Sequence, residues 1–238
     1  GSHGERHYAL RVAFSETSAA ESGIKANPHA FSAVSLQENK GRGYLCAMVY
    51  PIVAYGSPVL KRRAKEVDCP SAELTGFVDS MFETMYASKG VGLAAPQIGF
   101  STRVFVVDGS PFAEDPDNAE DAEVLKSFKK VFINAHILEE SGDEWAFEEG
   151  CLSIPDLHES VARKPTLRIK YQDLEGRWYE ETYSGVPARI IQHEYDHIEG
   201  ILFTDRLSPL KKRLIQGRLK DIAVGKVSSN YRMKFNVA

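Results

Sequence analysis

Cysteine is scarce in this chain, with three residues among 238: Cys46, Cys69 and Cys151. A low and odd count argues against a disulfide framework and favours a reducing compartment, so we expect a cytoplasmic protein. Long apolar runs are also lacking. No run is long enough to span a bilayer or to serve as the core of a secretory signal. The net charge of −4 gives no reason to expect sequence-specific nucleic-acid binding. These absences argue against a small disulfide-stapled fold and against a membrane partner.

The remaining composition is that of one globular domain, and it changes near Met48. The chain is 43% hydrophobic and 26% charged, and it is long enough for one sizeable core. Residues 1–47 are rich in Ala, Ser, Gly and Asn and show no sustained apolar period. The first three residues, Gly-Ser-His, have the form of an expression scar. We therefore expect residues 1–47 to be an N-terminal extension outside the core, and residues 48–238 to form the folded domain.

The apolar pattern after Met48 predicts both helices and strands. Apolar residues recur at helical spacing in some segments and alternate with polar residues in others. The expected helices are 71–89, 184–200 and 210–224, and the expected strands are 103–108, 131–133, 137–139, 167–171 and 177–183. Ser184 is expected to cap the second helix and Gly200 to end it. The fold class is α+β, with short antiparallel sheets packed around a central helix and a further helix at the C-terminus.

The central helix carries the segment Gln192-His193-Glu194-Tyr195-Asp196-His197. Residues four apart lie on one face of a helix, so His193 and His197 can direct two imidazoles at one metal ion. Glu194 is placed where a carboxylate can reach a water bound to that ion. This H-E-x-x-H spacing is typical of hydrolytic metal sites, and the third ligand distinguishes one class of hydrolase from another.

The usual third ligands of H-E-x-x-H peptidases are missing downstream. Phe203 stands where the metzincin class has its third histidine, and Glu199 is the last glutamate in the chain. Asp205 and Asp221 are the carboxylates that remain, so a peptidase stays open as an alternative.

Upstream, Cys151 stands within the segment Glu149-Gly150-Cys151-Leu152-Ser153. A thiolate is a strong ligand for a borderline metal ion. A lone cysteine is more often a small buried hydrophobe. Together with the two histidines and Glu194, however, Cys151 is the better candidate for the third ligand.

Three segments in order now resemble the motifs of the peptide deformylase family. They are Gly90–Gln97 for G-x-G-x-A-A-x-Q, Glu149–Ser153 for E-G-C-L-S, and Gln192–Gly200 for Q-H-E-x-D-H-L-x-G. The one departure is Ile198 in place of the usual leucine. Three ordered motifs are far more specific than any one of them. The resemblance covers roughly Met48 to the C-terminus, which would make residues 48–238 a peptide deformylase catalytic domain of the bacterial type.

The resemblance implies a metal-dependent hydrolase that removes the formyl group from formylmethionyl nascent peptides and releases formate. It implies one divalent metal ion on Cys151, His193 and His197, natively Fe²⁺, with Zn²⁺, Ni²⁺ or Co²⁺ as substitutes in a purified sample. A metal-bound hydroxide would be the nucleophile, and Glu194 the general acid and base. The catalytic oxyanion donors would be the side chain of Gln97 and the backbone N–H of Leu152.

The resemblance also implies a substrate pocket, a structural pair and a partner. The apolar pocket positions that match the family are Val91, Phe147, Val186 and Ile190, each of which could equally belong to the core. The backbone contacts to the peptide would fall at Val91, Gly92 and Gly150. Asp196 would pair with a buried Arg163. The basic residues of the C-terminal helix would contact the ribosome, although a solvated face is the ordinary reading of such a helix.

A second alternative, from a different class, is a metal-binding module without catalysis. Glu194 and Gln97 argue against it, because a closed structural site needs neither a proton shuttle nor an oxyanion donor. A fully protein-ligated ion without a water would support it.

Overall fold

The computed structural model describes residues 48–236, and the expected N-terminal extension, residues 1–47, lies outside them. The helices are α1 Ala72–Ala87, α2 Ala122–Ser127, α3 Gly185–Glu199 and α4 Pro209–Ala223. The strands are β1 Ile52–Val53, β2 Gly92–Ala94, β3 Val104–Asp108, β4 Lys129–Ser141, β5 Trp145–Cys151, β6 Ile154–Arg163, β7 Thr166–Gln172, β8 Trp178–Ser184 and β9 Met233–Lys234. Short 3₁₀ helices are η1 Pro58–Lys61, η2 Ala95–Ile98, η3 Ser110–Phe112, η4 Pro116–Asn118 and η5 Phe203–Arg206. No helix in residues 48–236 is both long and apolar enough to cross a membrane.

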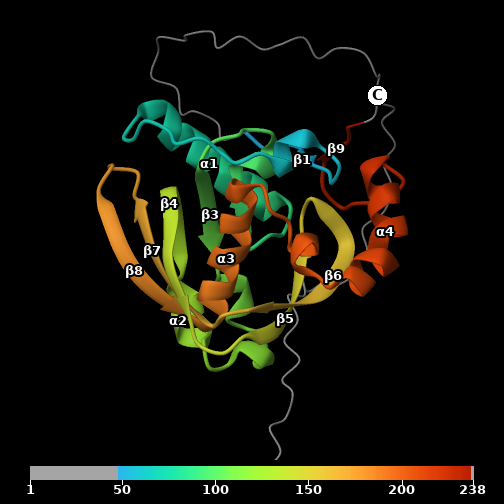
Figure 1. Ribbon diagram of the computed structural model, residues 1–238. Helices are drawn as coiled ribbons and strands as arrows, with labels where there is room; N and C mark the ends of the chain where they lie inside the picture. Colours follow the sequence, from blue (N-terminus) through green and yellow to red (C-terminus); the bar gives the residue numbers. More distant parts are fainter. Residues whose placement is uncertain (1–47, 237–238) are drawn as a thin grey trace, which may run out of the picture.

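Helix α3 lies at the centre of the molecule, between two sheets (Figure 1). On one side is a five-stranded antiparallel sheet in the order β2-β3-β4-β7-β8. On the other side is the antiparallel hairpin of β5 and β6, with α4 packed outside it. A third sheet joins β1 and β9 in parallel, which brings the two ends of the described chain together. The expected α+β class, with a central helix and a C-terminal helix, is confirmed.

Burial explains the position of α3. Twelve of its fifteen residues are buried, because it packs apolar side chains on the large sheet and polar ones toward β5 and β6. The helix ends at Gly200, whose φ of 76° is the left-handed conformation that favours glycine at this position. An added Cβ there would also lie 2.8 Å from the backbone of Lys61. The chain must therefore leave the helix at a glycine.

The expected cap at the start of α3 was wrong. Ser184 is extended, and its side chain makes no capping hydrogen bond. Asp121, which precedes α2, supplies the cap instead, since its Oδ2 accepts a hydrogen bond of 2.8 Å from Val186 N. An added Cβ on Gly185 would lie 2.4 Å from the same oxygen. The Asp121 carboxylate therefore caps the helix in place of Ser184. It can come this close to the helix end because Gly185 has no side chain.

Two of the expected strands are one strand. Residues 131–133 and 137–139 both belong to β4, whose register against β7 shifts between Ile133 and His136 and again after Ile137. Asn134 between them has a φ of 50°, and its side chain bonds Val67 and Gln172. These bulges interrupt the alternation of apolar and polar side chains. The sequence therefore reads as two short strands, although the strand itself is continuous.

Candidate active site

Cys151, His193 and His197 come together between α3 and the end of β5. The cysteine sulfur and one nitrogen from each imidazole all lie within 4.8 Å of one another. Sγ of Cys151 is 3.3 Å from Nε2 of His197. Both histidines are buried, and the cysteine is partly exposed to the cavity. One thiolate and two imidazoles suit a borderline divalent cation, so the donor set fits the divalent metal ion expected from the sequence.

The surroundings shift the pKa values of the two imidazoles in opposite directions. Burial lowers the pKa of His193, but hydrogen bonds with Cys151 and Glu149 outweigh it and raise that pKa well above its ordinary value. Burial and the neighbouring charge of His193 hold the pKa of His197 well below its ordinary value. A cation binds to neutral imidazole nitrogens, so its binding would displace any proton from the nitrogen that ligates it.

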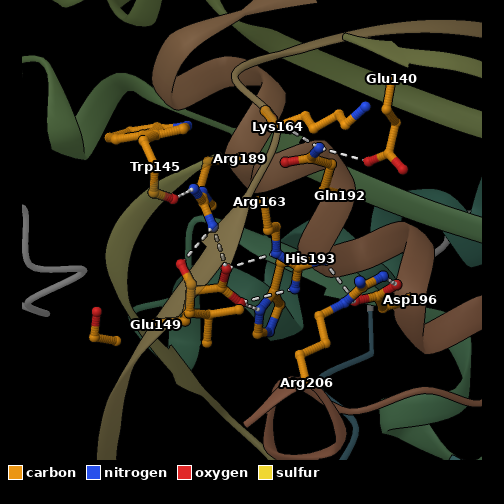
Figure 2. A network of polar contacts seen from close by, with 12 residues as sticks. Glu140, Trp145, Glu149, Arg163, Lys164, Arg189, Gln192, His193, Asp196 and Arg206 are labelled. Carbon is orange, nitrogen blue, oxygen red and sulfur yellow. Dashed lines mark hydrogen bonds and ion pairs between the residues drawn. The ribbon is translucent and has the colours of Figure 1, made fainter. Parts of the chain in front are cut away.

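Glu149 contacts the imidazole of His193 and orients it (Figure 2). Its Oε2 lies 2.9 Å from His193 Nδ1, which leaves Nε2 of that ring to face Cys151. Arg163 donates to both oxygens of Glu149, at 2.7 and 2.9 Å, and Arg189 Nη1 donates at 3.0 Å. Burial raises the pKa of Glu149, but the charge of Arg163 outweighs it and lowers that pKa well below its ordinary value. A charged carboxylate behind a ligating imidazole fixes its tautomer and orientation.

Asp196, near the end of α3, belongs to the same network of ion pairs (Figure 2). Arg163 Nη1 donates to its Oδ2 at 2.7 Å, as the sequence resemblance implied. Arg206, which sequence reasoning did not identify, donates to both oxygens of Asp196 at 2.5 Å. The carboxylate is buried, and Arg163 is only 4% exposed. Asp196 therefore points away from the two histidines and binds α3 to β6 and η5.

Replacing Asp196 with alanine is expected to cost about 3–5 kcal/mol in the free energy of unfolding, because Arg163 would lose part of its charge compensation while still buried. Metal bound per folded molecule should stay close to the wild-type value. Chemical denaturation followed by metal analysis of the folded fraction measures both. Asp143→Ala is the matched control, since Asp143 is exposed on the β4–β5 turn, and it should change stability by less than about 0.5 kcal/mol. A stable Asp196→Ala protein that had lost its metal would instead assign Asp196 to the metal site.

Glu194 lies against the backbone of β2. An added Cβ on Gly92 would be 2.4 Å from Oε1 of Glu194, so the carboxylate occupies the space that any other residue would fill. Glu194 is 4% exposed, and within residues 48–236 its Oε2 has no hydrogen-bond partner. Burial raises its pKa to about 7, and a bound cation nearby would lower it again. A buried carboxylate with a free oxygen beside a metal site is suited to proton transfer.

Gln97 directs its amide N–H group toward the same site. Its Oε1 accepts a hydrogen bond of 2.7 Å from Ala94 N, which determines how the amide is turned. Its Nε2 then lies 3.6 Å from the sulfur of Cys151. Leu152 follows that cysteine directly and lines the same cavity. The two expected oxyanion donors are therefore both beside the Cys-His-His cluster.

A cavity of about 390 Å³ opens over this cluster, a size typical of small-ligand sites. Four of the expected substrate positions line it: Val91, Gly92, Gly150 and Ile190. The other two do not. Phe147 and Val186 are 1% and 2% exposed and belong to the core beneath the large sheet.

The remaining lining residues come from four parts of the chain. They include Ala87–Gly90 at the end of α1, Phe112, Ile154–Asp156, and Ser228–Tyr231 near the C-terminus. His158 is exposed and also lines the cavity, and its ring fills the space beside Gly150.

Sequence reasoning missed Glu149, Arg189, Arg206 and Tyr231 at this site. Glu149 stands inside the cysteine motif, and its position two residues before a ligand was the one signal available. The arginines carry no such signal, because a buried arginine is recognisable only when its carboxylate partner is known. Tyr231 lies 79 residues from Leu152, the residue that it contacts.

Comparison with known proteins gives consistent results. A family model described as polypeptide deformylase matches residues 49–213. Peptide deformylase from Christiangramia forsetii is 53% identical over 189 residues, covering 79% of this chain and 96% of that protein. Peptide deformylase from Flavobacterium johnsoniae is 52% identical over 192 residues, covering 80% and 98%.

Solved structures show the same similarity. Peptide deformylase from Thermotoga maritima matches with a TM-score of 0.59 at 39% identity, covering 68% of this chain and 99% of its own. A variant of Arabidopsis thaliana peptide deformylase 1B matches with a TM-score of 0.65 at 32% identity, covering 76% and 97%.

Proposed function

Since this chain belongs to the peptide deformylase family, a family of metal-dependent hydrolases that remove the formyl group from nascent peptides, we propose which of its residues perform that reaction. The observation that carries the proposal is the position of Glu194. Its free carboxylate oxygen is buried next to the Cys-His-His cluster, at the cavity that would admit the substrate.

Cys151, His193 and His197 would hold the divalent cation, with Glu149 orienting His193 from behind. When bound, the cation supplies Lewis-acid polarisation and lowers the pKa of a water molecule from ~15.7 to roughly 7. Fe²⁺ is the proposed native ion. Zn²⁺, Ni²⁺ and Co²⁺ suit the same sulfur and nitrogen donors, so any of them can replace it during purification.

Glu194 would accept the proton of the attacking water and deliver it to the leaving amine. The packing of its carboxylate on Gly92 holds one oxygen in place and leaves the other free for that transfer. Gln97 Nε2 and the backbone N–H of Leu152 would stabilise the oxyanion that develops on the formyl oxygen. The products are formate and a peptide with a free amino terminus.

The methionine side chain of the substrate would enter the cavity against Val91 and Ile190, the apolar residues among the four expected positions that line it. Gly92 and Gly150 let the peptide approach the backbone closely on two sides, because neither carries a side chain.

Formate release distinguishes this function from that of an H-E-x-x-H peptidase. The purified protein should release formate from N-formyl-Met-Ala and leave the Met-Ala bond of an N-acetylated counterpart intact. Cleavage of that internal amide without formate release would contradict the proposal.

We further propose that the exposed basic face of α4 contacts the ribosome, and that the protein acts in the cytoplasm where nascent chains emerge. Arg213 and Lys220 lie two helical turns apart on one face, and both are exposed. Leu210 and Leu214 are exposed on the same helix, at 66% and 74%. A basic face serves binding to the negatively charged ribosome surface.

The double variant Arg213→Glu/Lys220→Glu is expected to weaken co-sedimentation with ribosomes about tenfold at low salt, while kcat on N-formyl-Met-Ala stays unchanged. Arg62→Glu/Lys164→Glu is the matched control, because it changes the net charge equally at exposed positions outside α4. Equal co-sedimentation of the two double variants would refute the contact. Deleting α4 is not a usable test, since Ile215, Leu219 and Ile222 are buried in the core.

A further inference from the structure

The C-terminal strap, which we define as Val227–Phe235, follows α4 and returns to the active site. Its strand β9 pairs in parallel with β1, where Ile52 N and Ala54 N donate to the carbonyls of Arg232 and Lys234. Figure 1 shows the two strands side by side. Ser228–Tyr231, just before β9, line the cavity over the Cys-His-His cluster. The family match ends at residue 213, so the whole strap lies beyond it.

Tyr231 is the part of the strap that reaches the catalytic segment. Its hydroxyl donates a hydrogen bond of 2.8 Å to the carbonyl oxygen of Leu152. Burial, together with the charge of Cys151, raises the pKa of Tyr231, which agrees with a hydroxyl that donates a hydrogen bond. The side chain of Ser229 accepts from Tyr231 N at 3.3 Å, which helps to fix the turn that carries the ring.

Three further contacts hold Leu152 and the residues on either side of it. Its side chain packs beside Gly90, where an added Cβ would lie 2.9 Å from Leu152 Cδ1. The next carbonyl, that of Ser153, accepts a hydrogen bond of 2.8 Å from Tyr55 N. On the other side, Cys151 is tied to the metal site. The backbone N–H of Leu152 is therefore placed between an anchored cysteine and an anchored carbonyl.

We propose that Tyr231 is a positioning residue, which fixes the Leu152 peptide so that its N–H points at the formyl oxygen in the transition state. The inference rests on the proposed function of Leu152 as an oxyanion donor. An oxyanion donor is effective only when its direction is set before the reaction, within about 10–20°. The carbonyl of Leu152 belongs to the peptide plane after the residue, and its N–H belongs to the plane before it, next to Cys151. With Cys151 anchored on one side and the Leu152 carbonyl held by Tyr231 on the other, rotation about the two backbone bonds between these planes is limited, and the direction of the N–H is limited with it.

The Tyr231→Phe variant removes one oxygen and keeps the ring, so the strap should stay folded. We expect kcat on N-formyl-Met-Ala to fall about five- to tenfold. This is less than the roughly 10²–10³-fold that follows loss of an oxyanion donor, because the N–H remains present but less well aligned. KM should stay within about twofold and metal content at one ion per chain, since neither the substrate pocket nor a ligand is removed.

Two further variants show whether the lost hydrogen bond is the cause. Replacing Tyr231 with 4-aminophenylalanine restores a neutral N–H donor at the same place and should recover most of kcat. Tyr50→Phe removes a tyrosine hydroxyl from a ring that packs on Phe77 and Phe100, outside the cavity lining, and should leave kcat unchanged.

Three results would overturn the proposal: an unchanged kcat in Tyr231→Phe, a change confined to KM or to metal content, or a loss that 4-aminophenylalanine does not restore. The wild-type protein separates this inference from the function on which it rests. If the wild type releases no formate, the proposed function fails. If the wild type is active and Tyr231→Phe equals it, the role of Tyr231 alone fails.

Discussion

Replacing Glu194 with glutamine should leave the protein folded and loaded with one metal ion, and should lower kcat for formate release by about 10²–10⁴-fold. Glutamine has nearly the same shape as glutamate, so the packing against Gly92 is kept. Its amide cannot accept a proton at neutral pH. The substitution therefore removes proton transfer and little else.

The free oxygen of Glu194 is the physical reason for so large an effect. Oε2 is buried and has no partner within residues 48–236, although a buried carboxylate oxygen is normally hydrogen-bonded. A fold retains such a group where a water or a reacting atom is its partner. Loss of proton transfer should appear in kcat rather than in KM, because the side chain does not hold the methionine of the substrate.

Steady-state kinetics with parallel metal analysis measures this effect. Glu148→Ala is the control, since Glu148 lies on β5 close to the site, is half-buried and lines no part of the cavity. It should stay within about twofold of wild type. Near-normal formate release by Glu194→Gln would show that another group shuttles the proton.

The Cys151→Ser variant is expected to weaken metal binding by more than about 100-fold and to abolish turnover at ordinary metal concentrations. Replacing a residue that hydrogen-bonds to a metal ligand already lowers metal affinity by about 10–100-fold. Replacing the ligand itself should lower the affinity further. A serine hydroxyl is a harder and less acidic donor than a thiol, so it is a poor substitute for a borderline cation. The fold should survive, because the Glu149–Arg163–Asp196 network does not include the thiol.

Cys69 provides the matched control. Both residues are free cysteines of intermediate burial, but the thiol of Cys69 donates to the carbonyl of Asp173 at 3.2 Å, outside the cavity lining. Cys69→Ser should bind one metal ion with unchanged affinity, as competition with a chelator would measure. Full metal occupancy in Cys151→Ser would mean that the cation is held elsewhere.

The elements that sequence predicted best are those with an uninterrupted period. Helix α1 begins after Ser71, whose side chain accepts from Leu74 N, and the hairpin of β7 and β8 matches the two alternating segments. Helix α4 runs over Pro209–Ala223, close to the expected 210–224. In each case the local signal and the tertiary environment favour the same structure.

Strands β5 and β6 were not predicted, although β5 carries Cys151. Their inward positions include Glu149 and Arg163, charged residues at places where an alternating pattern requires apolar ones. Those charges are stable inside only because each neutralises the other and His193 and Asp196 complete the network. Because the metal site needs these buried charges, β5 and β6 lack the regular alternation of apolar and polar residues by which a strand is recognised.

The substrate pocket shows a different limit. Phe147 and Ile190 are both apolar and both nearly buried, and sequence offers no means of telling which one faces the cavity. The structure places Ile190 at the cavity and Phe147 in the core, next to Trp145. Contacts between distant segments, such as Tyr231 with Leu152 or Asp121 with Val186, depend on topology that no local pattern encodes.

X-ray absorption at the metal edge, on protein prepared without oxygen, tests the central claim most directly. Binding by Cys151, His193 and His197 predicts one sulfur and two imidazole nitrogens around the ion, with the remaining position taken by a water oxygen. Addition of formate, the expected product, should alter that oxygen contribution and leave the sulfur and nitrogen contributions unchanged. A spectrum without sulfur, or one with four protein ligands and no water oxygen, would contradict the account.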